Sequence, residues 1–287
     1  MTPTALLSGL SEIADRYDAI LCDVWGVLHN GREAFTAACE ALREFRKARG
    51  PVVLITNAPV PKERVTRLFP RVGVPMDCFD DVVASGDATR NELMHMAPGP
   101  VYRIGLAEDI SVYAGLPLDF SDDPEIARVI CCTSLRDYPD GAPEPYRPEL
   151  KRLASYGLPM ICANPDIVFR QGDRLIWSAG ALAQIYTQEG GTVISPGKPD
   201  APIYKLALHR VAEIAGKTVT AERTLAIGDG PATDILGANR QGMDSVFIGS
   251  GIHGHVIGAG DEFMASAEKV LTEDGAHATY AMHSLAW

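Results

Sequence analysis

Three carboxylates of this 287-residue chain stand where acidic groups can do chemistry. Asp23 follows an apolar run and precedes a turn that contains Gly26, so its carboxylate could be presented to a substrate as a nucleophile. Asp229 and Asp234 lie on one loop that opens into a helix, and two such carboxylates suit a hard cation such as Mg²⁺. Asp also caps turns and helices, so each residue taken alone has a structural alternative.

Two further segments offer groups that could hold an anion. Lys198 lies between Gly197 and Pro199, where its ammonium group could neutralise a phosphoryl group or pair with a nucleophilic carboxylate. Thr56 and Asn57 follow an apolar run and offer a hydroxyl, an amide and backbone N–H donors to phosphate oxygens. A Thr-Asn pair can equally form a simple turn. These segments therefore indicate an anion site only in combination with the carboxylates.

The candidate residues follow short apolar runs, and most of these runs are followed by a loop and a helical pattern. Such an alternation predicts an α/β fold with a parallel sheet covered on both faces, and ligands bind at the carboxyl ends of such strands. We therefore expect the candidate residues to gather at one edge of a sheet. Its expected strands are 19–22, 52–55, 82–84, 192–194, 224–227 and 245–248, with helices at about 33–47, 61–69 and up to residue 93.

The middle of the chain differs in composition. Residues 97–148 are rich in Pro and Asp, and short strands are expected at 101–104, 129–132 and 160–163. This pattern predicts a second α/β unit inserted into the first. The expected core comprises residues 1–88 and 191–287, and the inserted unit comprises residues 89–190.

The order of these motifs resembles the haloacid dehalogenase superfamily, and specifically its class IIA branch of phosphatases acting on nitrophenyl-phosphate, glycerol-phosphate and sugar-phosphate substrates. The resemblance extends over nearly the whole chain. It rests on Asp-x-x-Gly-Val-Leu at 23–28, Thr-Asn at 56–57, Asn-Pro-Asp at 164–166, Gly-Lys-Pro at 197–199 and Gly-Asp-x-x-x-Thr-Asp-Ile-x-Gly-Ala at 228–238.

The resemblance implies a Rossmann-like core with an inserted α/β cap. It implies an Mg²⁺-dependent hydrolase that acts on a small phosphorylated metabolite, such as a sugar phosphate, through an aspartyl-phosphate on Asp23. The metal ligands would be Asp23, the backbone carbonyl of Trp25, and Asp229, while Asp234 would hold the metal's waters or Lys198. Thr56, Asn57 and Lys198 would hold the phosphoryl oxygens. A homodimer would also be in keeping with this branch.

One position departs from the pattern. Phosphatases of the superfamily carry a general-acid Asp two residues after the nucleophile, whereas this chain has Trp25, whose indole cannot transfer protons near neutral pH. General acid–base catalysis contributes about 10²–10⁴-fold, so turnover of poor leaving groups is expected to be slow. His29 is a candidate substitute, with a loop role as the alternative. Two other functions therefore stay open: a phosphometabolite-binding or regulatory protein, and a non-phosphatase reaction such as dehalogenation.

Composition and charge argue against nucleic-acid and membrane partners and favour the cytoplasm. With 26 basic and 37 acidic side chains, the net charge of −11 disfavours nucleic-acid binding. The densest basic stretch, residues 43–49, is interpreted as the solvated face of a helix. No secretory signal or membrane-spanning run is visible, and the six cysteines form no zinc motif, so we expect reduced thiols and a cytoplasmic protein. His253 and His255 are interpreted as loop residues rather than metal ligands.

Overall fold

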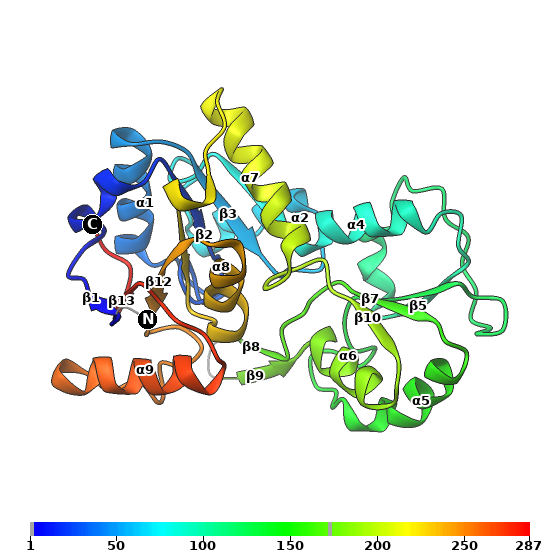
Figure 1. Cartoon of the computed structure of the whole chain (residues 1–287). Coiled ribbons are helices and arrows are strands. Elements are labelled where there is room, and N and C mark those ends of the chain that lie inside the picture. Colours follow the sequence, from blue (N-terminus) through cyan, green and yellow to red (C-terminus); the bar gives the residue numbers. More distant parts are fainter. Residues whose placement is uncertain (1–2, 172–173) are drawn as a thin grey trace. The chain divides into compact units, whose positions relative to one another are not determined.

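The computed structural model describes residues 3–171 and 174–287 (Figure 1). The chain forms two compact units. The first comprises Met1–Thr56, Thr66–Val83 and Pro199–Trp287, and the second comprises Asn57–Val65 and Ala84–Lys198. Each unit contains a parallel sheet with helices packed against it, which confirms the predicted α/β class.

The first unit is built on a seven-stranded sheet in the order β1-β13-β12-β11-β2-β3-β4. Every residue of β2, β3 and β11 is buried, because helices and loops cover both faces of the central strands. Strands β2 and β11 pair in parallel with Cys22 opposite Ile227, so their carboxyl ends lie side by side. The strands are β1 (Ala5–Leu6), β2 (Ala19–Cys22), β3 (Val52–Thr56), β4 (Asp81–Ala84), β11 (Thr224–Gly228), β12 (Asp244–Ile248) and β13 (Tyr280–Met282).

The helices around this sheet follow the predicted pattern with one interruption. The single helix expected over 61–69 is two short helices, because Pro70 cannot donate a backbone hydrogen bond and clashes with the preceding turn. Helices α1 and α7 both contact β3, and α8 contacts β12. The helices of the first unit are α1 (Thr36–Ala48), α3 (Phe69–Val72), α7 (Ala201–Ala215), α8 (Leu236–Gln241) and α9 (Phe263–Glu273), whereas all of α2 (Lys62–Thr66) except Thr66 belongs to the second unit.

The second unit has a four-stranded parallel sheet in the order β10-β7-β6-β5 and a separate antiparallel hairpin of β8 and β9. Apolar clusters cover both faces of the larger sheet, and the adjacent Cys131 and Cys132 belong to opposite clusters, as expected for neighbours on a strand. Its elements are α4 (Ser85–His95), β5 (Val101–Ile104), β6 (Val129–Cys132), α5 (Arg147–Ser155), β7 (Pro159–Cys162), β8 (Val168–Gln171), β9 (Arg174–Trp177), α6 (Ala179–Gln188) and β10 (Thr192–Ile194).

The strand expected at 192–194 exists, but its assignment to the core sheet is wrong. It is β10, which pairs in parallel with β7, with Val193 opposite Met160. The chain runs from β7 through the hairpin and α6 and returns beside β7, so residues 191–198 belong to the second unit. The other boundary also differs from residue 88, because α4 packs against β7 and its Gly86 N–H donates to Ala58 O.

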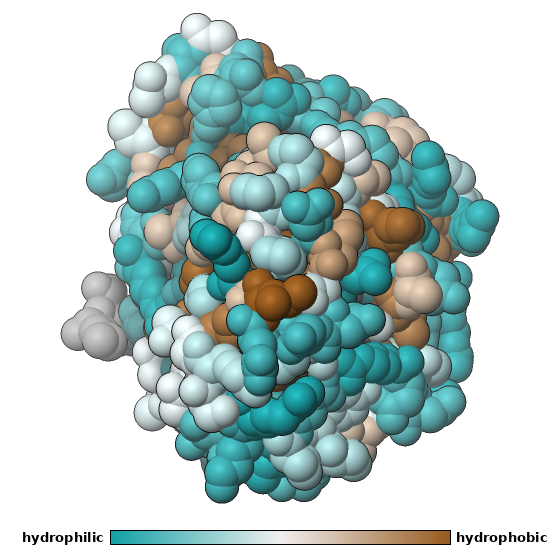
Figure 2. All heavy atoms as spheres, turned by 90° about the vertical axis from the view of Figure 1, so that its right-hand side faces the viewer, coloured by the Kyte–Doolittle hydropathy of each residue, from teal (hydrophilic) through white to brown (hydrophobic). Residues whose placement is uncertain are grey.

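The surface and the thiols agree with a globular protein. In the part of the chain that the structure describes, no helix has the length and apolar character needed to cross a bilayer. All six cysteines are buried thiols, and no disulfide joins any described residues. The face shown in Figure 2 is predominantly hydrophilic, with apolar side chains in small separate groups. Exposed apolar side chains of this kind are ordinary for a globular protein.

Candidate active site

Three acidic residues converge at the carboxyl edge of the core sheet. Asp23 follows β2, Asp229 follows the adjacent β11, and Asp234 lies on the π-helical turn Pro231–Ile235. One carboxylate oxygen from each lies within 4.8 Å of those of the other two. Their exposed fractions are only 6%, 7% and 5%, respectively. Three buried carboxylates at this distance repel one another strongly, and this is the donor set that a hard cation requires.

Asp229 is held by two glycines and one backbone amide. Gly26 has φ +85°, and a Cβ on either Gly26 or Gly251 would overlap the Asp229 carboxylate. The Ile252 N–H donates to Asp229 Oδ2 at 2.6 Å. The glycine of the Asp-x-x-Gly motif is therefore required by close packing as well as by its backbone conformation. These contacts of Gly251 and Ile252 with Asp229 were not predicted from the sequence, although two glycines shortly after β12 could have indicated a close approach at this end of the sheet.

Asp234 is fixed within its own loop. The Gly230 N–H donates to Asp234 Oδ2 at 3.1 Å, and a Cβ on Gly228 would overlap the Asp234 side chain. The carboxylate thus makes the loop contact that the structural alternative predicted, and it also faces Asp23 and Asp229. The two roles are compatible, because a carboxylate has several acceptor sites.

Trp25 lies on a tight turn immediately after Asp23. The Leu28 and His29 N–H groups both donate to Val24 O, and the Gly26 N–H donates to His29 O. The indole covers Gly31, where an added Cβ would lie 2.6 Å from its ring atoms. The indole and the imidazole of His29 meet edge-on, with ring centroids 4.9 Å apart. The side chain two residues after Asp23 is therefore packed into its own loop.

His29 lies beneath this loop and is fully buried. Its Nδ1 accepts a hydrogen bond from the Gly31 N–H at 3.0 Å, which places the proton of the neutral ring on Nε2. No described residue provides an acceptor for Nε2. Burial lowers the pKa of His29 to about 4, so the ring is neutral at pH 7. His29 supports Trp25 and is poorly suited to replace the general acid.

Thr56, Asn57 and Lys198 lie at two points along the chain where one unit ends and the other begins. Thr56 ends β3 in the first unit and is 3% exposed, whereas Asn57 and Lys198 belong to the second unit and are 3% and 2% exposed. The Asn57 side chain does not extend into solvent. It accepts from the Lys198 N–H at 2.8 Å and donates to Asp166 Oδ1 at 2.8 Å. Sequence reasoning assigned no role to Asp166.

The two histidines after β12 stay outside the carboxylate cluster. His253 is partly buried and His255 is exposed. Burial lowers the pKa of His253, which favours its neutral form. Among the described residues, the grouping of potential metal ligands is the one formed by the three aspartates, and it includes neither histidine.

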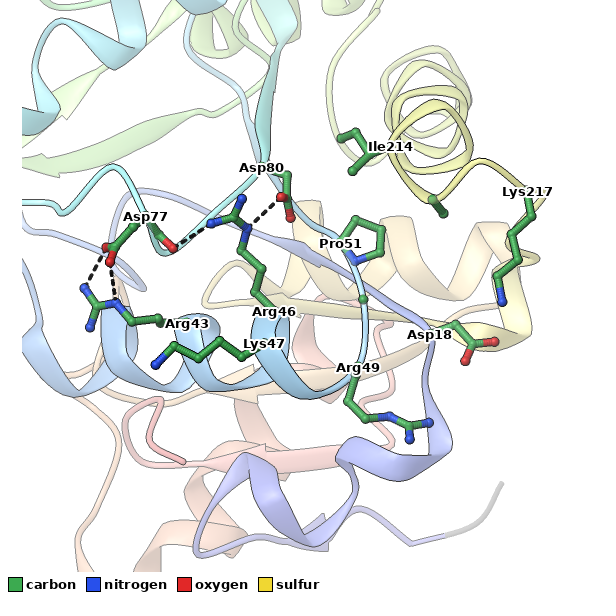
Figure 3. A pocket seen from close by; sticks show the side chains of 12 residues that line it. Asp18, Arg43, Arg46, Lys47, Arg49, Pro51, Asp77, Asp80, Ile214 and Lys217 are labelled. Atoms are coloured by element: carbon green, nitrogen blue, oxygen red, sulfur yellow. Dashed lines mark hydrogen bonds and ion pairs between the residues drawn. The ribbon is translucent and has the colours of Figure 1, made fainter.

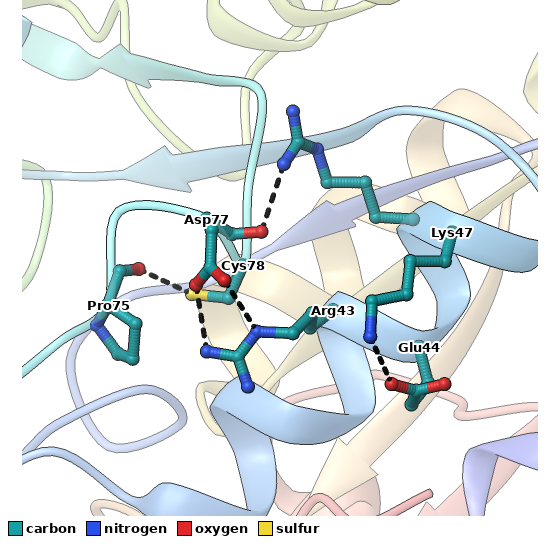
Figure 4. A network of polar contacts seen from close by, with 7 residues as sticks. Arg43, Glu44, Lys47, Pro75, Asp77 and Cys78 are labelled. Atoms are coloured by element: carbon teal, nitrogen blue, oxygen red, sulfur yellow. Dashed lines mark hydrogen bonds and ion pairs between the residues drawn. The ribbon is translucent and has the colours of Figure 1, made fainter.

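Figure 3 shows a charged pocket of about 580 Å³. It lies at the amino ends of β2, β3 and β4, whereas Asp23 and Asp229 follow the carboxyl ends of their strands. Arg43 donates to both carboxylate oxygens of Asp77 at 2.9 and 2.8 Å, and Arg46 donates to Asp80 at 2.6 Å. Lys47 pairs with Glu44 on the same helix face (Figure 4). Because α1 and α7 both end here, these cations also offset the negative ends of two helices. The pocket therefore has a structural explanation.

Comparisons with known proteins identify the family. Residues 20–116 match a family model described as haloacid dehalogenase-like hydrolase, and residues 195–277 match one described as HAD-hydrolase-like. The crystal structure of a haloacid dehalogenase-like hydrolase from Brucella suis 1330 is 40% identical, with a TM-score of 0.86 over 98% of this chain and 100% of that chain.

Two curated relatives match over most of their length. The 5'-nucleotidase YutF of Bacillus subtilis (strain 168) is 24% identical, covering 94% of this chain and 96% of that protein. The ribonucleotide monophosphatase NagD of Escherichia coli (strain K12) is 27% identical, covering 81% of this chain and 88% of that protein. The chain therefore belongs to the haloacid dehalogenase-like family of hydrolases, as its motifs predicted.

Proposed function

We propose that this hydrolase is an Mg²⁺-dependent phosphatase that cleaves a small phosphorylated metabolite, such as a sugar phosphate, with Asp23 as the nucleophile. The observation that carries the proposal is the cluster of Asp23, Asp229 and Asp234, with oxygens within 4.8 Å of one another. The names of the relatives, a 5'-nucleotidase and a ribonucleotide monophosphatase, support the phosphorylated class of substrate.

The donor set fits a magnesium ion. Asp23, Asp229 and the backbone carbonyl of Trp25 would hold it, with Asp234 beside them. When bound, the ion would offset the charge of the nucleophile and of the phosphoryl group. Without a cation, three buried carboxylates would oppose both folding and the approach of an anionic substrate.

The chain's own residues would perform the reaction in two steps. An oxygen of Asp23 attacks phosphorus, the bond between phosphorus and the leaving oxygen breaks, and an aspartyl-phosphate forms. Water then attacks this phosphorus, which releases inorganic phosphate and regenerates the Asp23 carboxylate. Thr56, Asn57 and Lys198 would hold the phosphoryl oxygens through N–H and O–H donors and one positive charge.

Trp25 restricts the leaving group in this scheme. The indole cannot protonate a leaving oxygen, and neutral His29 is buried behind it. Leaving groups that depart as stable anions, as in acyl and aryl phosphates, should therefore react well. Alkyl phosphates should react slowly, because an alkoxide needs a proton as it leaves.

Steady-state kinetics across three substrates test the proposal. The full chain is assayed with Mg²⁺ on acetyl phosphate, p-nitrophenyl phosphate and glycerol phosphate, and Asp23→Asn is the matched control. We expect turnover that a chelator abolishes and that falls along this series. The absence of phosphate release from all three substrates would refute the proposal.

Trp25 also favours a second candidate, a phosphometabolite-binding or regulatory protein with little turnover. It predicts Mg²⁺-dependent binding of a phosphorylated ligand that stays intact for hours, whereas rapid hydrolysis of the same ligand would exclude it. Dehalogenation is disfavoured by the cluster of three aspartates, because that reaction needs no cation. Halide release that a chelator leaves unchanged would support it instead.

Compartment and assembly are part of the same proposal. Six buried thiols without a disulfide among the described residues support a reducing compartment such as the cytoplasm. We also propose a homodimer, as the resemblance to the class IIA branch implies. Light scattering on the purified full chain tests it, and a monomer mass at micromolar concentration would refute it.

A further inference from the structure

The Asn57 side chain makes contacts that give this residue a second task beyond the phosphate binding proposed above. We infer that Asn57, oriented by Asp166, is a positioning residue that fixes the backbone of Lys198 and so directs its ammonium group. The inference rests on the proposed function, which assigns Lys198 to phosphate binding. All three residues belong to the second unit.

The Asn57 side chain clamps one peptide segment from both sides. The Lys198 N–H donates to Asn57 Oδ1 at 2.8 Å, and Asn57 Nδ2 donates to Lys198 O at 3.2 Å. One amide thus satisfies both backbone groups of a single residue, as a neighbouring strand would. Both residues are almost fully buried, so water cannot easily replace these bonds.

Asp166 determines which way the amide faces. Its Oδ1 accepts from Asn57 Nδ2 at 2.8 Å, and an ionised carboxylate can only accept. A flipped amide would turn its oxygen toward this carboxylate and its NH₂ group toward the Lys198 N–H, so both contacts would become repulsive. The carboxylate therefore holds the one orientation in which the clamp on Lys198 closes.

The surrounding backbone leaves the clamp little freedom. A Cβ on Gly197 would lie 2.6 Å from Asn57 Oδ1 and 2.7 Å from Ser85 Oγ, so only glycine allows this approach. Asp166 is itself fixed, because its N–H donates to Asn164 Oδ1 at 3.1 Å. Pro199 restricts the backbone on the other side of Lys198. The Asn-Pro-Asp motif at 164–166 and the Gly-Lys-Pro motif at 197–199 therefore act together, through Asn57, to fix the backbone of Lys198.

The clamp has a defined functional consequence. A long flexible side chain loses entropy when it is held in one geometry, and a fixed backbone reduces the number of positions its ammonium group can occupy. Loosening the clamp should therefore lower kcat more than it raises KM. It should also weaken the binding of inorganic phosphate without abolishing it, since the charge on Lys198 remains.

Hydrogen exchange at the Lys198 amide tests the inference without requiring turnover. We expect Asp166→Ala to increase its exchange rate about tenfold, the change that corresponds to one hydrogen bond worth about 1.4 kcal/mol. Asp166→Asn keeps an acceptor and should stay near the parent in exchange and in kcat. Asn57→Ala removes the clamp itself and should increase the exchange rate of the Lys198 amide more than either Asp166 variant does.

Asp109→Ala is the matched control. Asp109 lies in the same unit and accepts from Thr133 Oγ1 and Ser134 Oγ, each at 2.7 Å, so its loss disturbs the fold without touching the clamp. Unchanged exchange at Lys198 in both Asp166→Ala and Asn57→Ala, or an equal increase in Asp109→Ala, would overturn the inference. A parent protein without phosphatase activity would refute the proposed function alone, because the exchange result does not depend on it.

Discussion

The two ends of the core sheet both concentrate charge, but they do so in opposite ways. At the carboxyl end, the aspartates at 23, 229 and 234 are buried, alike in sign and within 4.8 Å of one another. At the amino end, arginines of α1 face carboxylates of the turn before β4, and each pair is formed at the surface. The amino end is neutralised by its own side chains, whereas the carboxyl end needs a charge that the three aspartates do not provide.

The burial and the sign of neighbouring charges distinguish a ligand site from an ordinary surface better than the density of charge does. An exposed ion pair changes the free energy of folding only slightly, so a protein surface can carry many such pairs that have no function. Buried like charges carry a large unfavourable energy that persists only where something else compensates it. Function is therefore expected where like charges are buried close together, and variants at the two ends should behave differently.

The largest expected effect comes from removing Asp23, the proposed nucleophile. Asp23→Asn keeps the shape of the side chain but cannot form the aspartyl-phosphate, so kcat on acetyl phosphate should fall at least about a thousandfold. Phosphate-release assays check this. Retention of more than a tenth of the parent's rate would move the chemistry away from Asp23.

The next largest effect is expected at Trp25, on the turn that follows Asp23. Trp25→Asp supplies the general acid that the proposed mechanism lacks, and it should raise turnover of glycerol phosphate by up to about 10²–10⁴-fold, with a much smaller change for p-nitrophenyl phosphate. The cavity left by the indole can reduce this gain. His29→Gln is the control and should leave the ratio of the two rates unchanged. Equal parent rates on both substrates, with no gain in the variant, would show that another group already transfers the proton.

The repulsion between the three buried aspartates can be measured without an activity assay. At an Mg²⁺ concentration of 100 times Kd, binding should stabilise the parent by about 2.7 kcal/mol, and Asp229→Asn should lose most of this gain. In a chelator, the variant should be at least as stable as the parent, because one of three mutually repelling charges is gone. Thermal unfolding in both buffers checks this, and equal Mg²⁺ stabilisation of the two proteins would remove Asp229 from the proposed metal site.

Removing Lys198, the proposed phosphate-binding cation, should have a smaller effect than removing a proposed metal ligand but a larger effect than breaking any surface ion pair. Lys198→Ala removes a charge-assisted contact worth about 1.5–3 kcal/mol and should weaken vanadate binding at least about tenfold. Competition against p-nitrophenyl phosphate gives the affinity. Unchanged affinity would reduce Lys198 to a loop residue.

The sequence predicted local features well and long-range contacts poorly. Apolar runs predicted β2, β3 and β11, and acids at the ends of these runs predicted that Asp23 and Asp229 lie together at one end of the sheet, because both signals lie within a few residues. The partner sheet of β10 was misassigned, since a three-residue apolar strand has the same pattern in either sheet. The contact of Gly251 with Asp229 and that of Asp166 with Asn57 join distant segments, and no local pattern encodes them.

The smallest expected effect tests the amino end of the sheet. Arg46→Ala breaks the contact with Asp80, in which the arginine side chain is 38% exposed, so unfolding should become easier by only about 0.2–1 kcal/mol. Since salt screens exposed charges, the difference from the parent should shrink when NaCl is raised from 0.05 to about 1 M. Urea unfolding at both salt concentrations checks this, and kcat should stay at the parent's value. A large loss of activity would mean that the amino end also serves the reaction, and the distinction between exposed ion pairs and buried like charges would no longer locate the site.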